Sequence, residues 1–155
     1  MVPVRLRGHH FLCVLTYQGL GYTPEFTSNM TIVVDCIAHG APVQLMEGPD
    51  HICAALRPVD RVRCAHDCQA PGIYARDRAA EATAEGLLRR DLRVARPLTD
   101  DDLQILRNGF LDSNNRGACE GCRWKPSCDE IARTGFEDTV LVERRIASVQ
   151  EGTTP

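Results

Sequence analysis

Apolar and polar positions change their spacing several times along the first forty residues. Residues 2–7 (VPVRLR) alternate apolar and basic side chains, which predicts a short strand with one solvent-facing side. Residues 9–21 (HHFLCVLTYQGLG) predict a short helix that stops at two glycines. Thr23 and Pro24 are typical of an N-cap and a first helical position, and apolar residues then recur at helical spacing as far as Gly40. This pattern predicts a second, longer helix.

The next stretch mixes short elements with one irregular segment. Residues 43–48 predict a second strand, and residues 73–92 predict an alanine-rich helix with a charged, solvated face. Thr99 and the three aspartates after it start another helix, because acids are favourable at the positive end of the helix dipole. Residues 113–118 indicate a loop. Residues 52–72 carry cysteines without clear periodicity, and such a long loop suggests that a bound metal holds it.

These elements predict one helix-dominated α+β domain with two or three short strands and a cysteine-ligated metal site. The domain is expected to cover residues 1–150, which is enough chain for a hydrophobic core. Residues 138–146 predict a last strand or helix, and residues 151–155 a frayed tail.

Composition narrows the class of partner. Arginines are spread among acidic residues rather than gathered on one helix, and the net charge is −3, so a nucleic-acid partner is not expected. The longest apolar run near the start, residues 11–15, is too short to cross a bilayer. No secretory leader pattern follows Arg5 and Arg7, so we expect a cytoplasmic protein with no membrane association.

Eight cysteines in a cytoplasmic chain favour metal binding or thiol chemistry over disulfides. Three of them fall in "ACEGCRWKPSC", where Cys119-x-x-Cys122 predicts a tight turn that presents two thiolates to one metal. Ser127 and Glu130 are spaced as a capping box, which would place Cys128 in the first turn of a helix. The helix dipole would then lower the pKa of that thiol and make it a good ligand.

A closed zinc site or a [4Fe–4S] cluster normally has four ligands, and this stretch supplies three. The fourth is expected to be Cys53 or another cysteine, or else one iron stays open to a small molecule. The spacing does not choose among Cys53, Cys68, Cys64 and Cys13. Trp124 is interpreted as an apolar lid over the metal. Cys36 is interpreted as a small buried hydrophobe on the apolar side of its helix.

A second group of reactive residues lies near the N-terminus. His9 and His10 are four and three residues before Cys13, so each pair can share a helix face. The two histidines are adjacent, so we expect them to point in different directions. A histidine beside a thiol can ligate metal or act as a general base, but it can equally well be a structural residue at a helix start. Asp50 precedes Cys53 in the turn "GPDHIC", and such turns often carry chemistry.

Four blocks of this sequence resemble a family of small bacterial and archaeal proteins of unknown function that are thought to bind an iron–sulfur cluster. The blocks are "LRGHHFLCVLTYQGLGYTPEF", "GPDHIC", the Arg76–Asp77 pair and "CEGCRWKPSCDEIARTGF". The likeness runs from about Val4 to Phe136. It implies an iron–sulfur site and six matching cysteines: Cys13, Cys53, Cys68, Cys119, Cys122 and Cys128.

The chain departs from that family at two places. His51 stands where family members often have a second acid, and Leu56 stands where many have a cysteine. A compact four-cysteine site in the middle loop is therefore not expected, and a site anchored at Cys119, Cys122 and Cys128 is favoured.

The leading hypothesis is an iron–sulfur enzyme that transfers or inserts sulfur, with the cluster as a Lewis acid or sulfide carrier. Cys13 or Cys53 would carry a persulfide, and His9 or His10 with Asp50 would move protons. Its partner would be a small-molecule substrate or sulfur donor. Alternatives are an electron carrier or sensor, a zinc-stabilised protein-binding module, and a thiol redox switch. The Cys-x-x-Cys-x-x-Cys spacing of ferredoxins is absent, which counts against a simple carrier.

Overall fold

Two short parallel strands open the fold. The computed structural model describes residues 1–64 and 66–142. Strand β1 (Val4–Leu6) pairs with β2 (Val43–Leu45), with Val4 opposite Val43 and Leu6 opposite Leu45. Parallel strands need a crossover of a dozen or more residues, and helices α1 and α2 supply it here. Both predicted strands are confirmed, although each is only three residues long.

Helix α2 (Pro24–Ala38) is the longer predicted helix and confirms its start signal. The hydroxyl of Thr23 accepts a hydrogen bond from the amide of Phe26 at 3.0 Å, and Pro24 occupies the first helical position. The predicted apolar positions of α2 are buried in the core: Phe26, Met30, Val33, Val34 and Ile37.

Helix α1 (Gly8–Cys13) is shorter than predicted, because it ends at Cys13 and not at the two glycines. It packs against α4 (Pro71–Leu88) with its backbone in close approach. A Cβ atom at Gly8 would stand 2.1 Å from the carbonyl oxygen of Asp77, so only glycine fits this position. This contact brings the start of α1 directly under the middle of α4.

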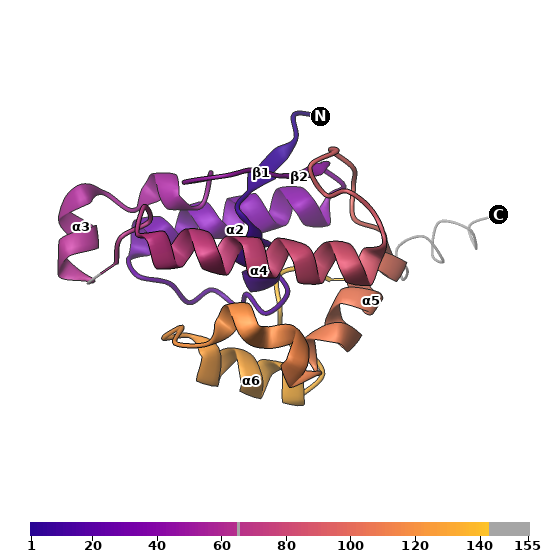
Figure 1. The fold of residues 1–155 in the computed structure, drawn as a ribbon. Helices are drawn as coiled ribbons and strands as arrows, with labels where there is room; N and C mark the ends of the chain where they lie inside the picture. Colours follow the sequence, from indigo (N-terminus) through magenta and orange to yellow (C-terminus); the bar gives the residue numbers. More distant parts are fainter. Residues whose placement is uncertain (65, 143–155) are drawn as a thin grey trace.

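The C-terminal helices lie on the other side of α4 (Figure 1). Helix α5 (Asp100–Phe110) begins with a capping box in which Thr99 and Asp102 exchange side-chain and backbone hydrogen bonds. Helix α6 (Lys125–Arg133) follows the cysteine-rich turn. Figure 1 shows α4 crossing the middle of the molecule, with the strands and α2 on one side and α6 on the other.

Two segments predicted as loops contain short helices. The middle loop forms the 3-10 turn η1 (Cys53–Ala55) and helix α3 (Pro58–Arg63), and the 113–118 loop forms the 3-10 segment η2 (Ser113–Cys119). Six residues of helix are too few to show a periodic pattern, although Pro58 at the first position and the Arg57–Asp60 ion pair fit one.

The architecture is α+β and dominated by helices, as predicted. No helix in the described part of the chain is both long and apolar enough to cross a membrane. Residues 138–142 contain no helix or strand; the remainder of the predicted 138–146 element, and the predicted tail at 151–155, lie outside the described residues.

Candidate functional site

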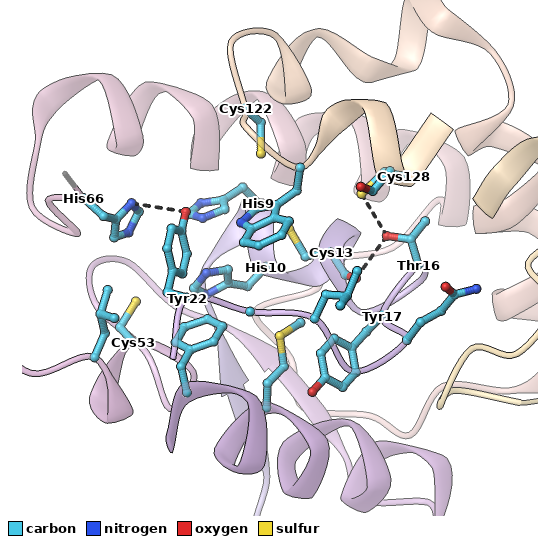
Figure 2. Close-up of a pocket in the computed structure, with 18 of the residues that line it drawn as sticks. His9, His10, Cys13, Thr16, Tyr17, Tyr22, Cys53, His66, Cys122 and Cys128 are labelled. Carbon is cyan, nitrogen blue, oxygen red and sulfur yellow. Dashed lines mark hydrogen bonds between the residues drawn. The ribbon is translucent and has the colours of Figure 1, made fainter. Parts of the chain in front are cut away.

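One open cavity collects most of the cysteines and both N-terminal histidines. Its walls come from α1 and the loop after it, from α2, from the middle loop and from α6, and its empty volume, mouth included, is about 850 Å³. Figure 2 shows His9, His10 and Cys13 in the middle of this cavity, with Cys53 at one end and Cys128 at the other. Five cysteines line it: Cys13, Cys53, Cys68, Cys122 and Cys128.

The Cys119-x-x-Cys122 turn has the compact form that its spacing predicted. The amide of Cys122 donates to the carbonyl of Cys119 at 3.1 Å, and Gly121 has a φ of 75°, which favours glycine. Arg116 donates from Nε to the Cys119 sulfur at 3.5 Å. The half-buried Trp124 lines the cavity just beyond this turn.

The predicted capping box at Cys128 is wrong. Helix α6 begins at Lys125, with Pro126 in its first turn, so Cys128 is its fourth residue and its amide donates to the carbonyl of Trp124 at 2.9 Å. The Ser127 side chain makes no cap, and Glu130 pairs with an arginine further along α6.

The expected lowering of the Cys128 pKa is therefore also wrong. Burial raises the pKa of the Cys128 thiol, and the nearby thiols of Cys122 and Cys119 raise it further. The hydroxyl of Thr16 donates to the Cys128 sulfur at 3.2 Å and opposes this rise.

Cys13 joins these three cysteines from the other side of the cavity. Burial raises the pKa of its thiol well above the usual range, and the charges that Cys128, Cys122 and Cys119 would carry raise it further. Helix α1 thus delivers a fourth thiol to the C-terminal three. We call Cys13, Cys119, Cys122 and Cys128 the cluster site.

The spacing of the cluster-site sulfurs bears on which metal would fit. Tetrahedral zinc with Zn–S bonds of about 2.3 Å would hold its sulfurs about 3.8 Å apart. Within the described residues, no three sulfurs of the cluster site all lie within 4.8 Å of one another. A multi-iron cluster places each thiolate on a different iron and tolerates a wider spread. The sulfurs are therefore more widely spread than a bound zinc ion would hold them.

Cys53 and Cys68 form a separate group, which we call the dithiol pair. Both residues are buried, at 2% and 1% exposure, and their thiols are in hydrogen-bonding contact. The guanidinium of Arg7 donates from Nη1 to the Cys53 sulfur at 3.6 Å and to the Cys68 carbonyl at 2.7 Å. Arg7 thus ties the middle loop down by hydrogen bonds at the place where we expected a metal.

Arg7 itself is a correction to the strand pattern. The alternation of residues 2–7 predicted a solvent-facing arginine, and Arg5 is exposed, but Arg7 has 0% exposure. Its Nε donates to Asp77 of α4 at 2.8 Å, and the guanidinium lies over the Tyr74 ring. A buried arginine is retained only when it is paired in this way.

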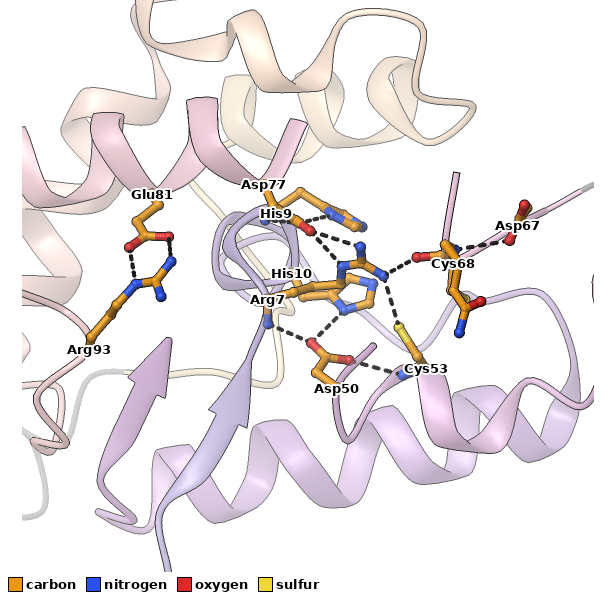
Figure 3. Close-up of polar contacts among 11 residues, drawn as sticks. Arg7, His9, His10, Asp50, Cys53, Asp67, Cys68, Asp77, Glu81 and Arg93 are labelled. Atoms are coloured by element: carbon orange, nitrogen blue, oxygen red, sulfur yellow. Dashed lines mark hydrogen bonds and ion pairs between the residues drawn. The ribbon is translucent and has the colours of Figure 1, made fainter. Parts of the chain in front are cut away.

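Two buried aspartates hold the two histidines. Figure 3 shows His10 against Asp50 and His9 against Asp77, with Nδ1-to-carboxylate distances of 2.8 and 2.6 Å. The rings stand 4.2 Å apart and both line the cavity, so the expectation that adjacent histidines point in different directions is wrong. Asp50 also accepts from the backbone amides of Arg7, Ile52 and Cys53.

The two His–Asp pairs titrate in opposite directions. Burial would lower the pKa of His10, but the Asp50 carboxylate raises it to about 9. Burial and the neighbouring His10 lower the pKa of His9 to about 4, despite its contact with Asp77. Burial would raise the pKa of Asp50, but His10 and the backbone amides hold it below its usual range.

His10, Asp50 and Cys53 also form a group that could hold a metal ion. Their ligand atoms all lie within 4.8 Å of one another, and all three residues are buried. The Arg7 guanidinium, whose Nη1 lies 3.6 Å from the Cys53 sulfur, would repel an ion bound there. The ion would also compete with three backbone amides for the Asp50 carboxylate oxygens. The neighbouring guanidinium and the amides on Asp50 therefore oppose a cation at this place.

The other two cysteines lie apart from both groups. Cys36 is exposed, so its interpretation as a buried hydrophobe is wrong. Cys64 is half-buried and contacts the carbonyl of Tyr22 at 3.8 Å. The Tyr22 ring stands edge-on to Trp124 at 5.6 Å and near His66, and these aromatic rings line the mouth end of the cavity.

Sequence reasoning missed the polar residues that support the site. Arg7 and Asp77 both stand in blocks that carry the family resemblance, and that is the one signal that could have found them. Thr16, which donates to the Cys128 sulfur, lies in the same first block, whereas Arg116, which donates to Cys119, had no signal.

Comparison with known proteins gives a family and no activity. No curated protein and no solved structure matches the chain. One family model matches residues 21–128, which is more than half of the chain and includes the middle loop and all three C-terminal cysteines. The iron–sulfur part of the resemblance stays a prediction. By this match the chain belongs to the family described as protein of unknown function, DUF1284.

Proposed function

We propose that this protein is an iron–sulfur protein whose cluster is held by Cys13, Cys119, Cys122 and Cys128 and serves electron transfer or redox sensing. The observation that carries the proposal is the approach of Cys13 to the other three thiols, across more than a hundred residues of sequence.

The electrostatics of the cluster site call for a cation. Burial and the repulsion between neighbouring thiolates both raise the pKa values of Cys13 and Cys128. A bound metal reverses that balance, because thiolates are the form that ligates it.

Neighbouring donors support negative charge on the sulfurs. Thr16 donates to Cys128 at 3.2 Å, and Arg116 donates to Cys119 at 3.5 Å while its Nη2 pairs with Asp129 at 2.8 Å. Such hydrogen bonds orient metal ligands and adjust a cluster's reduction potential. Trp124 and Tyr22 add apolar surface to the cavity wall, where their rings stand edge-on to each other.

A cluster with four cysteine ligands supplies one-electron chemistry. All four iron positions of a [4Fe–4S] cluster would then be taken by protein sulfur, which favours an electron carrier or sensor over the sulfur-inserting enzyme. This reverses the order of the two hypotheses that the sequence suggested.

A cluster-dependent sulfur transferase remains the second candidate because of the cavity. A simple electron carrier needs no internal space, whereas this site opens onto about 850 Å³ lined by histidines and further thiols. In that alternative Cys13 is free to carry persulfide and three cysteines hold the cluster.

The test is metal analysis of protein purified without oxygen, beside a Cys13→Ser variant and a Cys36→Ser control. We expect a brown protein that absorbs at about 400 nm and contains iron and acid-labile sulfide. Cys13→Ser should lose most of the iron, and Cys36→Ser, which changes an exposed thiol, should keep it. Zinc alone, or no metal, would overturn the proposal. An intact cluster in Cys13→Ser would favour the sulfur transferase.

A further inference from the structure

We propose that the dithiol pair is a redox-active site of its own, in which Cys53 and Cys68 are oxidised by hydrogen peroxide to a reversible disulfide with His10 as the acid–base group. The two thiols are already in contact, although fourteen residues separate them in the chain. This inference does not depend on whether the cluster site holds iron.

A relay of side chains reaches the Cys53 sulfur. His10 hydrogen-bonds to Cys53, and its Nδ1 lies 2.8 Å from the Asp50 carboxylate. Asp50 is fixed in turn by three backbone amides, one of them that of Cys53 itself. A thiol next to a histidine that a carboxylate orients is the arrangement of an activated cysteine.

Arg7 fixes both halves of the pair with one nitrogen. Its Nη1 donates to the Cys53 sulfur and to the Cys68 carbonyl, and its Nε is held by Asp77. A buried guanidinium beside a sulfur favours the thiolate and disfavours a second cation. The dithiol pair therefore has a fixed positive group of its own beside the Cys53 sulfur.

Burial limits the oxidant to a small molecule. Cys53 and Cys68 are 2% and 1% exposed and both line the cavity, so a small oxidant is favoured over a bulky disulfide substrate. Hydrogen peroxide is the size of two water molecules and enters easily. The contact between the two thiols lowers the pKa of Cys68 and raises that of Cys53, so Cys68 ionises first and is the first nucleophile, while Cys53 keeps its proton until His10 accepts it.

The reaction balances in three steps. The Cys68 thiolate attacks one peroxide oxygen and becomes sulfenic acid; the O–O bond breaks, and the departing hydroxide takes a proton from the His10 imidazolium to leave as water. Neutral His10 then accepts the Cys53 S–H proton. The Cys53 thiolate attacks the Cys68 sulfur, the S–O bond breaks, and hydroxide leaves as the second water with a proton from solvent. Two electrons pass from the two thiols to peroxide, and a thiol reductant reverses the change.

The test treats the full chain with stoichiometric hydrogen peroxide, blocks the remaining thiols by alkylation in denaturant, and maps the peptides by mass spectrometry. We expect one Cys53–Cys68 link that forms in wild type and in the Cys36→Ser and Cys64→Ser controls and disappears on treatment with dithiothreitol. Cys53→Ala should leave Cys68 as sulfenic or higher acids. Fully alkylated Cys53 and Cys68 after treatment, or a link from either one to a different cysteine, would overturn the proposal.

The role of His10 has its own readout. In His10→Gln the disulfide should form about 100-fold more slowly but reach the same final extent, because an acid–base group changes the rate and not the end point. An unchanged rate in a variant with wild-type thermal unfolding would remove His10 from the mechanism. Iron content is measured on the same samples. A Cys53–Cys68 disulfide in protein that contains no iron would contradict the proposed iron–sulfur cluster and support the proposed dithiol site.

Discussion

The cluster site and the dithiol pair contain the same reactive atom among different neighbours. At the cluster site, Arg116 lies beside Cys119 and Arg76 lies near Cys13, but burial and the neighbouring thiols still raise the pKa values of Cys13 and Cys128. At the dithiol pair, the buried Arg7 and the His10–Asp50 pair surround two sulfurs. The comparison teaches that the neighbours of a cysteine differ from site to site: the cluster site gathers thiols, whereas the dithiol pair has a buried guanidinium and a His–Asp pair beside it.

Removing the Arg7 guanidinium from the dithiol pair should have the largest effect on stability. Arg7→Met should lower the free energy of unfolding by about 3–5 kcal/mol, because it leaves the Asp77 carboxylate buried and partly unpaired. Denaturant unfolding of the metal-free protein measures this loss. The matched control is Arg5→Met on the exposed side of β1, which should change stability by about 0.5 kcal/mol or less. Equal stability of the two variants would show that Arg7 is not the anchor described above.

The pH dependence of stability should report on the histidines beside the dithiol pair. The pKa of His10 is about 9 in the folded chain against 6.5 ordinarily, so its contribution is complete below pH 6.5 and is lost as the pH rises towards 9. The pKa of His9 is about 4, so its contribution is present above pH 6.5 and is lost as the pH falls towards 4. The free energy of unfolding should fall by on the order of 3 kcal/mol on the alkaline side and by a similar amount on the acid side, with a maximum near pH 6.5.

Urea unfolding across this pH range measures both limbs. His10→Asn should flatten the alkaline limb and His9→Asn the acid limb. The raised thiol pKa values of Cys13 and Cys53 continue the decline above about pH 9, so the difference between variant and wild type isolates each histidine. A curve that neither substitution changes would place the titration elsewhere.

A substitution at Thr16 tests the cluster site, and its expected effect is smaller. Thr16→Val removes the hydroxyl that donates to the Cys128 sulfur, while Thr16→Ser keeps a donor at the same place. A lost hydrogen bond of about 1 kcal/mol corresponds to about 40 mV for one electron, and the potential should fall because the bond favours the more negative, reduced state. Redox titration followed by absorbance measures the shift. A rise in Thr16→Val, or an equal fall in Thr16→Ser, would contradict it.

Local signals in the sequence were sufficient for the starts of α2 and α5 and for both strands. Thr23 and Pro24 start α2, and Thr99 with its aspartates starts α5, because a cap needs only neighbours within three or four residues. The same logic failed at Ser127, where Pro126 fits the first turn of a helix that begins earlier.

The site depended on contacts that no local pattern encodes. Cys13 lies near cysteines that are more than a hundred residues away in sequence. Arg7 is buried in the core because it pairs with Asp77, which is seventy residues further along the chain. Periodicity treats an arginine in an alternating strand as solvent-facing, since a paired buried charge looks the same as an exposed one in sequence. The resemblance blocks marked these places without saying what they do.

Helix α1 spans only Gly8–Cys13, yet it presents His9 to one aspartate, His10 to another and Cys13 to the cluster site. Successive residues of a helix are turned by about 100°, so a single residue inserted between His10 and Cys13 would keep one end in place and swing the other away. The rotational register of six residues therefore aligns both histidines with their aspartates and Cys13 with the other three thiols, and an insertion there is expected to lose one of these alignments.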